Sequence, residues 1–171
     1  MLETLPPPAT LWLLVPLLAT LLIMVLLRGG RGPTHDGHDP YVIDGDTIVS
    51  DGARIRLAGI DAPELSQPGG AAARRHLIWL IAGGAIRIEP LSTDRYGRMV
   101  ARVHARSGDL GRMMVRDGYA LSYYGADYRA EERLARKRRA GLWAGPGISS
   151  PEAYRASAAP NAKKRKASRW T

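Results

Sequence analysis

The stretch Y-V-I-D-G-D-T-I-V-S-D-G-A-R-I-R-L-A-G-I, residues 41–60, decides the fold. It holds two runs of strand-favouring residues, 41–50 and 53–60, which are joined by Asp51 and Gly52. An Asp-Gly pair between two such runs is the strongest short hairpin signal, because both positions tolerate the positive φ angles of a type I′ turn. The sequence therefore predicts two paired antiparallel strands at the start of a β-rich domain.

Helices and further strands follow this hairpin. Residues 67–82 carry apolar positions at helical spacing and end at Gly83 and Gly84, which is typical of an amphipathic helix. The later elements are expected as strands at 85–91, 98–105 and 119–122 and helices at 110–117 and 127–140. Short antiparallel strands with interspersed helices predict an α+β fold built on a five-stranded β-barrel, for which the OB-fold is the common nucleic-acid-binding case.

The N-terminal segment is long and apolar. No residue from 4 to 27 is charged, and 9–27 form a nearly continuous apolar run, close to the length of about 20 residues that a transmembrane helix needs. Glu3 precedes the run and no A-x-A motif follows it, which favours an uncleaved anchor over a cleaved signal peptide. We therefore expect residues 1–27 to be a transmembrane helix or uncleaved signal, in a single-pass membrane protein of bacterial type.

Polar segments flank the expected domain, which spans residues 41–144. Residues 28–40 are rich in Gly, Pro and polar side chains and predict a linker, whereas 145–171 predict a basic disordered tail. The net charge of +9 favours an anionic partner, either nucleic acid or a phospholipid surface. The run K-K-R-K at 163–166 either binds one of these partners or is simply solvated. The absence of cysteine excludes disulfides, thiolate metal sites and cysteine nucleophiles.

Three charged clusters carry the candidate chemistry. D-G-D at 44–46 places two carboxylates at positions of the same parity, so a regular strand would project both to one face, and Gly45 suits a bulge or a close approach. R-L-A-G-I-D-A-P-E at 56–64 and D-R-Y-G-R at 94–98 add arginines and further carboxylates. Hard oxygen ligands suit calcium or magnesium, arginines suit phosphate oxygens, and a carboxylate can take a proton from water. Together the clusters predict phosphodiester hydrolysis.

The second cluster also predicts an irregular strand. Strand alternation puts Arg56 and Asp61 on opposite faces, because their positions differ in parity. Both side chains can serve one phosphate only if the alternation is broken between them. We expect the break at Gly59.

The order and spacing of I-D-G-D-T, R-L-A-G-I-D-A-P-E, D-R-Y-G-R, V-R-D-G-Y-A and G-L-W resemble the thermonuclease, or staphylococcal nuclease, family over residues 41–143. The resemblance implies an OB-fold barrel with three helices and a bound calcium ion. The implied ligands are the side chains of Asp46 and Asp61 and the backbone carbonyl of Ala62, with Asp44 in the outer shell. The best-studied members carry threonine in place of Ala62, a change that leaves the carbonyl ligand in place.

The resemblance also implies the catalytic and substrate-binding groups. Glu64 would be the general base, and Arg56 and Arg98 would bind the phosphate. Tyr96, Tyr124 and Arg95 match positions around the nucleotide, although a lysine can stand where Arg95 does. The implied reaction is calcium-dependent cleavage of single-stranded or frayed DNA or RNA that leaves 3′-phosphate products.

The side of the membrane and the catalytic competence are open at this point. The family resemblance favours an extracytoplasmic nuclease domain, whereas Arg28 and Arg31 after the apolar run favour the cytoplasm by the positive-inside rule. A catalytically silent OB module that binds nucleic acid or a partner, and a membrane-surface scaffold, are the alternatives to an enzyme. The complete set of implied acidic and arginine residues favours the enzyme, which we expect to be a monomer.

Overall fold

The structure is a computed structural model that describes residues 33–123, 127–145, 148–154 and 156, together with three positions, 16, 19 and 20, nearer the N-terminus. The chain divides into two compact units, Met1–Arg31 and Gly32–Thr171, and the second carries the fold. The expected N-terminal anchor lies outside the described residues apart from those three positions. Among the residues that are described, no helix has the length and apolar character needed to cross a membrane.

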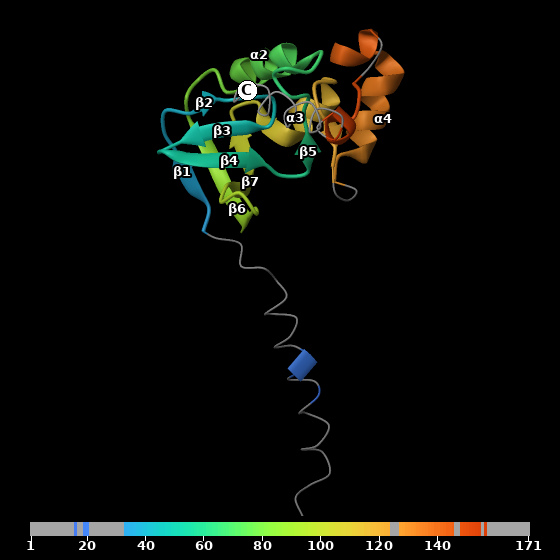
Figure 1. Cartoon of the computed structure of the whole chain (residues 1–171). Coiled ribbons are helices and arrows are strands. Elements are labelled where there is room, and N and C mark those ends of the chain that lie inside the picture. The colour runs from blue at the N-terminus through green and yellow to red at the C-terminus, as the bar shows by residue number, and fades with distance from the viewer. Residues whose placement is uncertain are drawn as a thin grey trace, which may run out of the picture. The chain divides into compact units, whose positions relative to one another are not determined.

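A curled seven-stranded sheet forms the body of the second unit (Figure 1). Its strands lie in the order β1 (His35–Gly37), β6 (Ile86–Thr93), β7 (Met99–Ala105), β4 (Ala53–Leu57), β3 (Thr47–Ser50) and β2 (Tyr41–Val42), and β8 (Gly108–Asp109) pairs with β7. A separate two-stranded sheet joins β5 (Ile60–Asp61) to β9 (Leu121–Ser122). The domain is thus a mixed α+β structure with an OB-like curled sheet, as the sequence predicts.

The pairing of β4 with β7 is parallel, unlike the other pairs in the described sheets. Parallel neighbours need a long crossover, which α2 and β6 supply here. The sequence predicts antiparallel units only, because hairpin signals reveal neighbours along the chain and a parallel partner leaves no local signal.

The predicted hairpin is confirmed. Asp51 and Gly52 have φ angles of 50° and 75°, and Ser50 pairs with Ala53 across the turn. The strand expected over 41–50 is not continuous, however. It is divided into β2 and β3 by a turn at 43–46, in which the Ile43 amide donates to the Thr47 carbonyl at 2.9 Å.

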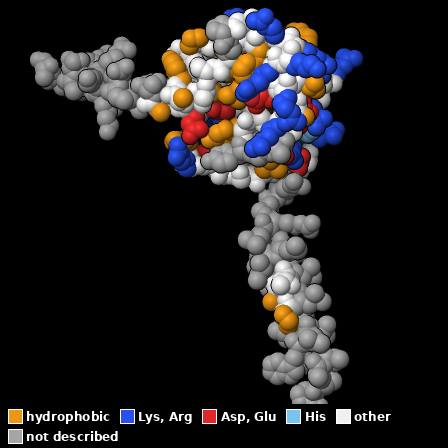
Figure 2. Space-filling model, turned by 90° about the vertical axis from the view of Figure 1, so that its right-hand side faces the viewer, with side chains coloured by type: hydrophobic (Ala, Val, Ile, Leu, Met, Phe, Trp, Pro, Cys, Tyr) orange, Lys and Arg blue, Asp and Glu red, His pale blue; other side chains and the backbone are white. Residues whose placement is uncertain are grey.

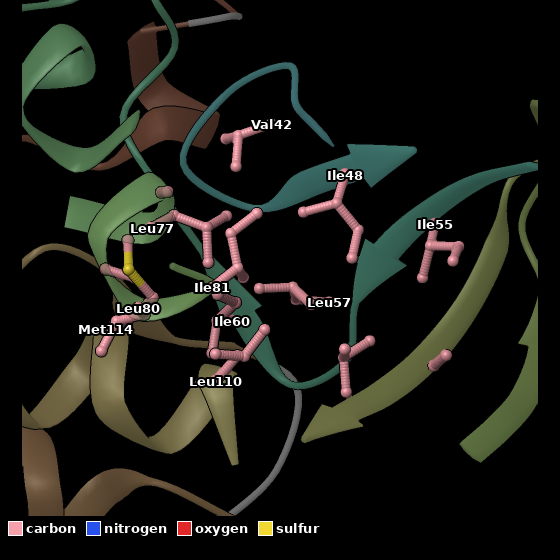
Figure 3. Packing of buried hydrophobic residues seen from close by; sticks show 14 of the residues in the cluster. Val42, Ile48, Ile55, Leu57, Ile60, Leu77, Leu80, Ile81, Leu110 and Met114 are labelled. Carbon is pink, nitrogen blue, oxygen red and sulfur yellow. The ribbon is translucent and has the colours of Figure 1, made fainter. Parts of the chain in front are cut away.

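Helices form close to the predicted positions. They are α2 (Gly70–Leu80), α3 (Leu110–Arg116), α4 (Arg129–Arg138) and the 3-10 helix η1 (Gly141–Ala144). The α3 helix begins after Asp109, whose carboxylate accepts from the Arg112 amide at 3.1 Å as an N-cap. The core lies between the sheet and the helices, where Ile48, Leu57, Leu77 and Leu110 meet (Figure 3). Full burial of one such side chain contributes about 1.5–3 kcal/mol.

The ordered domain extends past both boundaries drawn from composition. His35–Gly37, which fall in the expected linker, form β1 and pair with Ile86–Ile88 of β6. Ser149 and Tyr154, which fall in the expected tail, hydrogen-bond to residues 66–67. Gly- and Pro-rich composition therefore underestimates the domain at each end, because edge strands and short helical turns need few apolar residues.

Candidate active site

The turn at 43–46 places the first two carboxylates. Asp44 accepts from the Asp46 amide at 3.1 Å, as Asx turns do, so a turn rather than a regular strand brings the two residues together. Arg74 of α2 holds the turn by donating to the carbonyls of Val42 and Ile43 at 3.0–3.2 Å. Gly45 is a close approach, as expected: a Cβ there would lie 2.6 Å from the Ala62 Cβ.

Arg56 connects two buried carboxylates at the centre of the site. Its Nη1 donates to Asp46 Oδ2 at 2.7 Å, and its Nη2 donates to Asp61 Oδ1 at 3.1 Å. Asp46 and Asp61 are only 5% and 2% exposed. Thr47 Oγ1 and the Ala62 amide donate to Asp46 as well, at 2.9 and 3.3 Å. Residues from the first two motifs thus form one hydrogen-bonded group.

Burial governs the electrostatics of this group. Desolvation raises the pKa of Asp46 above its ordinary value, and the charge of Asp44 adds to this effect despite the opposing charge of Arg56. Burial alone would lower the pKa of Arg56, but the carboxylates of Asp46 and Asp61 outweigh it and raise that pKa. Arg56 is therefore a counter-charge shared by two buried carboxylates.

The predicted irregularity at Gly59 is confirmed. Gly59 has a φ of +74° and lies in a turn between β4 and β5. Arg56 Nη2 consequently reaches both the Ile60 carbonyl, at 3.3 Å, and Asp61. The strand break resolves the parity conflict that the sequence presents.

The third motif forms a turn before β7. Asp94 Oδ1 accepts from the amides of Tyr96 and Arg98 at 2.9 and 3.0 Å, and Asp94 Oδ2 accepts from Arg98 Nε at 2.7 Å. Burial would raise the pKa of Asp94, but these bonds outweigh it and lower the pKa. Arg98 directly precedes β7 and has the same parity as Val100, which pairs with Arg56 in the parallel ladder, so strand alternation places Arg98 and Arg56 on the same side of the sheet.

The predicted substrate-binding residues divide into two groups. The guanidiniums of Arg95 and Arg98 lie 4.8 and 5.5 Å from the centre of the Tyr96 ring, which is 68% exposed. Such an open ring with two cations beside it suits contact with a nucleotide. Tyr124 lies outside the described residues.

Glu64 follows Ala62 by two positions and is half-buried in the loop between β5 and α2. Its amide donates to Gln67 Oε1 at 3.3 Å, and its carbonyl accepts from the Gln67 amide at 2.8 Å. Sequence reasoning assigned no role to Gln67, Thr47 or Asp94, which hold Glu64, Asp46 and Arg98 respectively. Thr47 and Asp94 lie inside the quoted motifs, close in sequence to Asp46 and Arg98, and this closeness was the signal that could have identified them as partners.

The donor set is suitable for a hard cation. Asp46, Asp61 and the Ala62 carbonyl offer oxygen atoms only, which are the ligands that hard cations prefer. Within the described part of the chain, no group of three or more His, Cys, Asp or Glu side chains is arranged to hold a metal. Two carboxylates and one carbonyl are a donor set of the kind that calcium and magnesium accept together with water ligands.

An OB-like domain in which an arginine joins two buried carboxylates belongs to a class of proteins suited to acting on phosphodiesters. The family described as "Staphylococcal nuclease homologue" matches residues 54–145. The chain belongs to this family.

Several curated relatives carry nuclease names. The micrococcal nuclease of Shigella flexneri is 34% identical over 133 residues, which cover 67% of this chain and 76% of the relative. The staphylococcal-like nuclease CAN1 of Arabidopsis thaliana is 32% identical over 123 residues, 70% of this chain and 38% of the relative. The probable endonuclease LCL3 of Nakaseomyces delphensis is 36% identical over 121 residues, 59% of this chain and 47% of the relative. The chain spans about a third of the length of the plant relatives.

Proposed function

We propose that the chain is a calcium-dependent phosphodiesterase that hydrolyses DNA, RNA or both and leaves 3′-phosphate products. The observation that carries this proposal is the bridge of Arg56 between the buried carboxylates of Asp46 and Asp61. Membership of the staphylococcal nuclease family supports it. The finer architecture that goes with this function is a closed five-stranded OB barrel with three helices.

Asp46, Asp61 and the Ala62 carbonyl are the proposed calcium ligands, with Asp44 in the outer shell. When bound, calcium supplies positive charge next to the phosphate. Arg56 stays between the two carboxylates and is thereby fixed in orientation. Its named hydrogen bonds leave guanidinium donors for phosphate oxygens, since a guanidinium has five N–H groups.

Glu64 takes a proton from the attacking water, and Arg56 and Arg98 stabilise the charge that develops on the phosphate oxygens. Arg98 is held by Asp94 through its Nε edge, which limits its freedom before substrate binds. Arg95, Tyr96 and Tyr124 bind the nucleotide. Preorganised donors of this kind contribute more to the transition state than to substrate binding.

The proposed partners are single-stranded or frayed nucleic acid and a lipid bilayer. Lysine and arginine side chains gather over the domain face that Figure 2 shows, which favours a polyanionic substrate. We place the apolar N-terminal segment in the membrane as a single-pass anchor, with a monomeric nuclease domain outside the cytoplasm. Protease accessibility in spheroplasts tests this orientation, and protection of the domain from added protease contradicts it.

The test of the activity is a cleavage assay on single-stranded DNA and RNA with the full chain, in calcium and in EGTA. Glu64→Gln is expected to lower kcat by about 10²–10⁴-fold, and Arg98→Ala is also expected to lower it strongly. Asp36→Asn and Arg87→Ala are matched controls, because both residues are exposed and pair with each other in β1 and β6, two strands that carry no residue of the site. Phosphatase-sensitive 3′ ends identify the products. Calcium-dependent cleavage that is absent from the intact chain, or undiminished in both site variants, contradicts the proposal.

A further inference from the structure

The loop that carries Glu64 is closed by the side chain of Gln67. Gln67 is only 3% exposed, and its side-chain Oε1 accepts from the Glu64 backbone amide, while the backbone N–H of Gln67 donates to the Glu64 carbonyl. The Gln67 carbonyl accepts from the Gly70 amide at 2.9 Å, which attaches the loop to the first residue of α2. The Glu64 amide thus depends on the buried side chain of Gln67, whereas the Glu64 carbonyl is held by the Gln67 backbone.

Residues 148–154, here called the strap, hold Gln67 from the other end of the chain. Gln67 Nε2 donates to the carbonyl oxygen and to Oγ of Ser149, at 2.8 and 2.7 Å. Tyr154 Oη donates to the Ser66 carbonyl at 2.9 Å, which gives the strap a second attachment to the same loop. The strap lies beyond residue 145, where the family match ends.

The strap is a small folded element. Pro151 is buried, and the Tyr154 amide donates to the Ser150 carbonyl at 3.0 Å in a helical turn that includes residues 151–154. Ser150 Oγ accepts from the Ala153 amide at 3.3 Å and caps this turn. This turn fixes the backbone at Tyr154 and directly after Ser149, the two residues that attach the strap to the loop.

Without the strap, the buried amide group of Gln67 would lose both of its named acceptors. A buried donor without an acceptor is costly, so Gln67 would turn toward water and release the Glu64 amide. A general base contributes fully only when its carboxylate is held within reach of the water it deprotonates.

From this arrangement we infer that Gln67 is a positioning residue for Glu64 and that the strap fixes its side chain. The inference rests on the proposed function for the role of Glu64, whereas the link between strap and loop is a property of the fold. Residues outside the family match would then set the turnover of this nuclease.

The test compares the full chain with Gln67→Leu, with a chain ending at 147, and with a chain ending at 156. The last two lack the basic C-terminal end, but only the chain ending at 156 keeps the strap. Gln67→Leu and the chain ending at 147 are expected to lower kcat about 10- to 100-fold. KM is expected to stay within about threefold, because the phosphate-binding groups are unchanged. The chain ending at 156 is expected to match the full chain in kcat.

Hydrogen exchange of the peptide covering residues 62–69 measures how firmly the strap holds the Glu64 loop, independently of catalytic activity. Exchange is expected to speed up in Gln67→Leu and in the chain ending at 147, but not in the chain ending at 156. If the intact chain does not cleave, the proposed function fails, and exchange alone decides whether the strap holds the loop. Equal exchange in the chains ending at 147 and 156 overturns the inference.

A combined variant separates positioning from general loss of stability. If Gln67 and the strap act through one link, the kcat of the combined variant, Gln67→Leu in the chain ending at 147, is expected to equal that of the more affected single variant. If the fold-loss of kcat in the combined variant equals the product of the two single fold-losses, the two changes act independently and the inference is overturned.

Discussion

At the scale of single residues, Arg56 has both a structural role and a proposed chemical role. It balances two carboxylates that are almost completely buried, and the same guanidinium is a proposed phosphate ligand. A buried ion pair is costly to break from one side, because the remaining charge has no counter-charge. Arg56 variants therefore affect folding as well as catalysis, and the two effects must be measured separately.

Arg56→Met is expected to lower the free energy of unfolding by about 3–5 kcal/mol in EGTA, because Asp46 and Asp61 lose their cation. Calcium is expected to restore part of this loss by supplying positive charge. Arg54→Met is the matched control, since Arg54 lies in the same strand and is exposed. Urea denaturation measures both, and equal losses in the two variants would argue against the role of Arg56.

The hydrogen bonds to Asp94 predict a pH dependence. Its lowered pKa means that the ionised carboxylate stabilises the folded state above the ordinary value of 3.8, and that this contribution is lost as the pH falls through the lowered pKa. Asp94→Asn lacks this titration. The melting temperature of the unchanged protein should exceed that of Asp94→Asn at neutral pH, and the difference should shrink in strong acid. A difference that does not vary with pH would refute the assignment.

At the scale of elements, the turn at 43–46 shows what the sequence could and could not predict. The hairpin at Asp51 and Gly52 was predictable, because its turn chemistry is local. The interruption between β2 and β3 was not, because Val42, Ile43, Thr47 and Ile48 read as one continuous strand. Arg74 of α2 and the packing against Ala62 impose this turn from outside the segment.

The candidate site follows the same division. Motif order alone identified Asp46, Arg56, Asp61 and Arg98, and the structure brings the first three into direct contact. The partners that hold these groups in place were not predictable. Gln67 meets Ser149 from 82 positions away, and no periodicity or motif marks a pair at that separation.

Gly45→Ala tests the turn as a packed element. Its new Cβ would lie 2.6 Å from the Cβ of Ala62 and 2.8 Å from the Cβ of Ala73, so neighbouring backbone must shift. We expect a loss of about 1–3 kcal/mol in the free energy of unfolding. Gly145→Ala is the control, because nothing lies within 4 Å of its added Cβ. Similar stability of the two variants in urea would contradict the close approach.

At the scale of the whole molecule, the domain is larger than its composition indicates. β1 pairs with β6 at the N-terminal side, and the strap attaches to residues 66–67 at the C-terminal side. Each segment contributes backbone or side-chain hydrogen bonds rather than a large apolar surface. Such segments are invisible to a search for hydrophobic periodicity, although they complete the fold.

A chain trimmed to the composition-based domain, 41–144, is expected to melt at least about 4 °C below a chain that spans 33–156, since it loses both segments. A chain spanning 41–156 separates the contribution of β1 from that of the strap. Differential scanning calorimetry measures all three. Equal melting temperatures would show that the added segments do not contribute to stability.

The parallel pairing of β4 with β7 also sets the order in which the site can form during protein synthesis. A ribosome completes Asp46, Arg56, Asp61 and Glu64 early, but β7 begins at Met99 and pairs only after α2 and β6 have been made. Pairing between distant segments is the slow part of folding, because a long loop must close first. A nascent chain therefore carries the acidic half of the candidate site well before Arg98 can join it, so the site is completed late in translation.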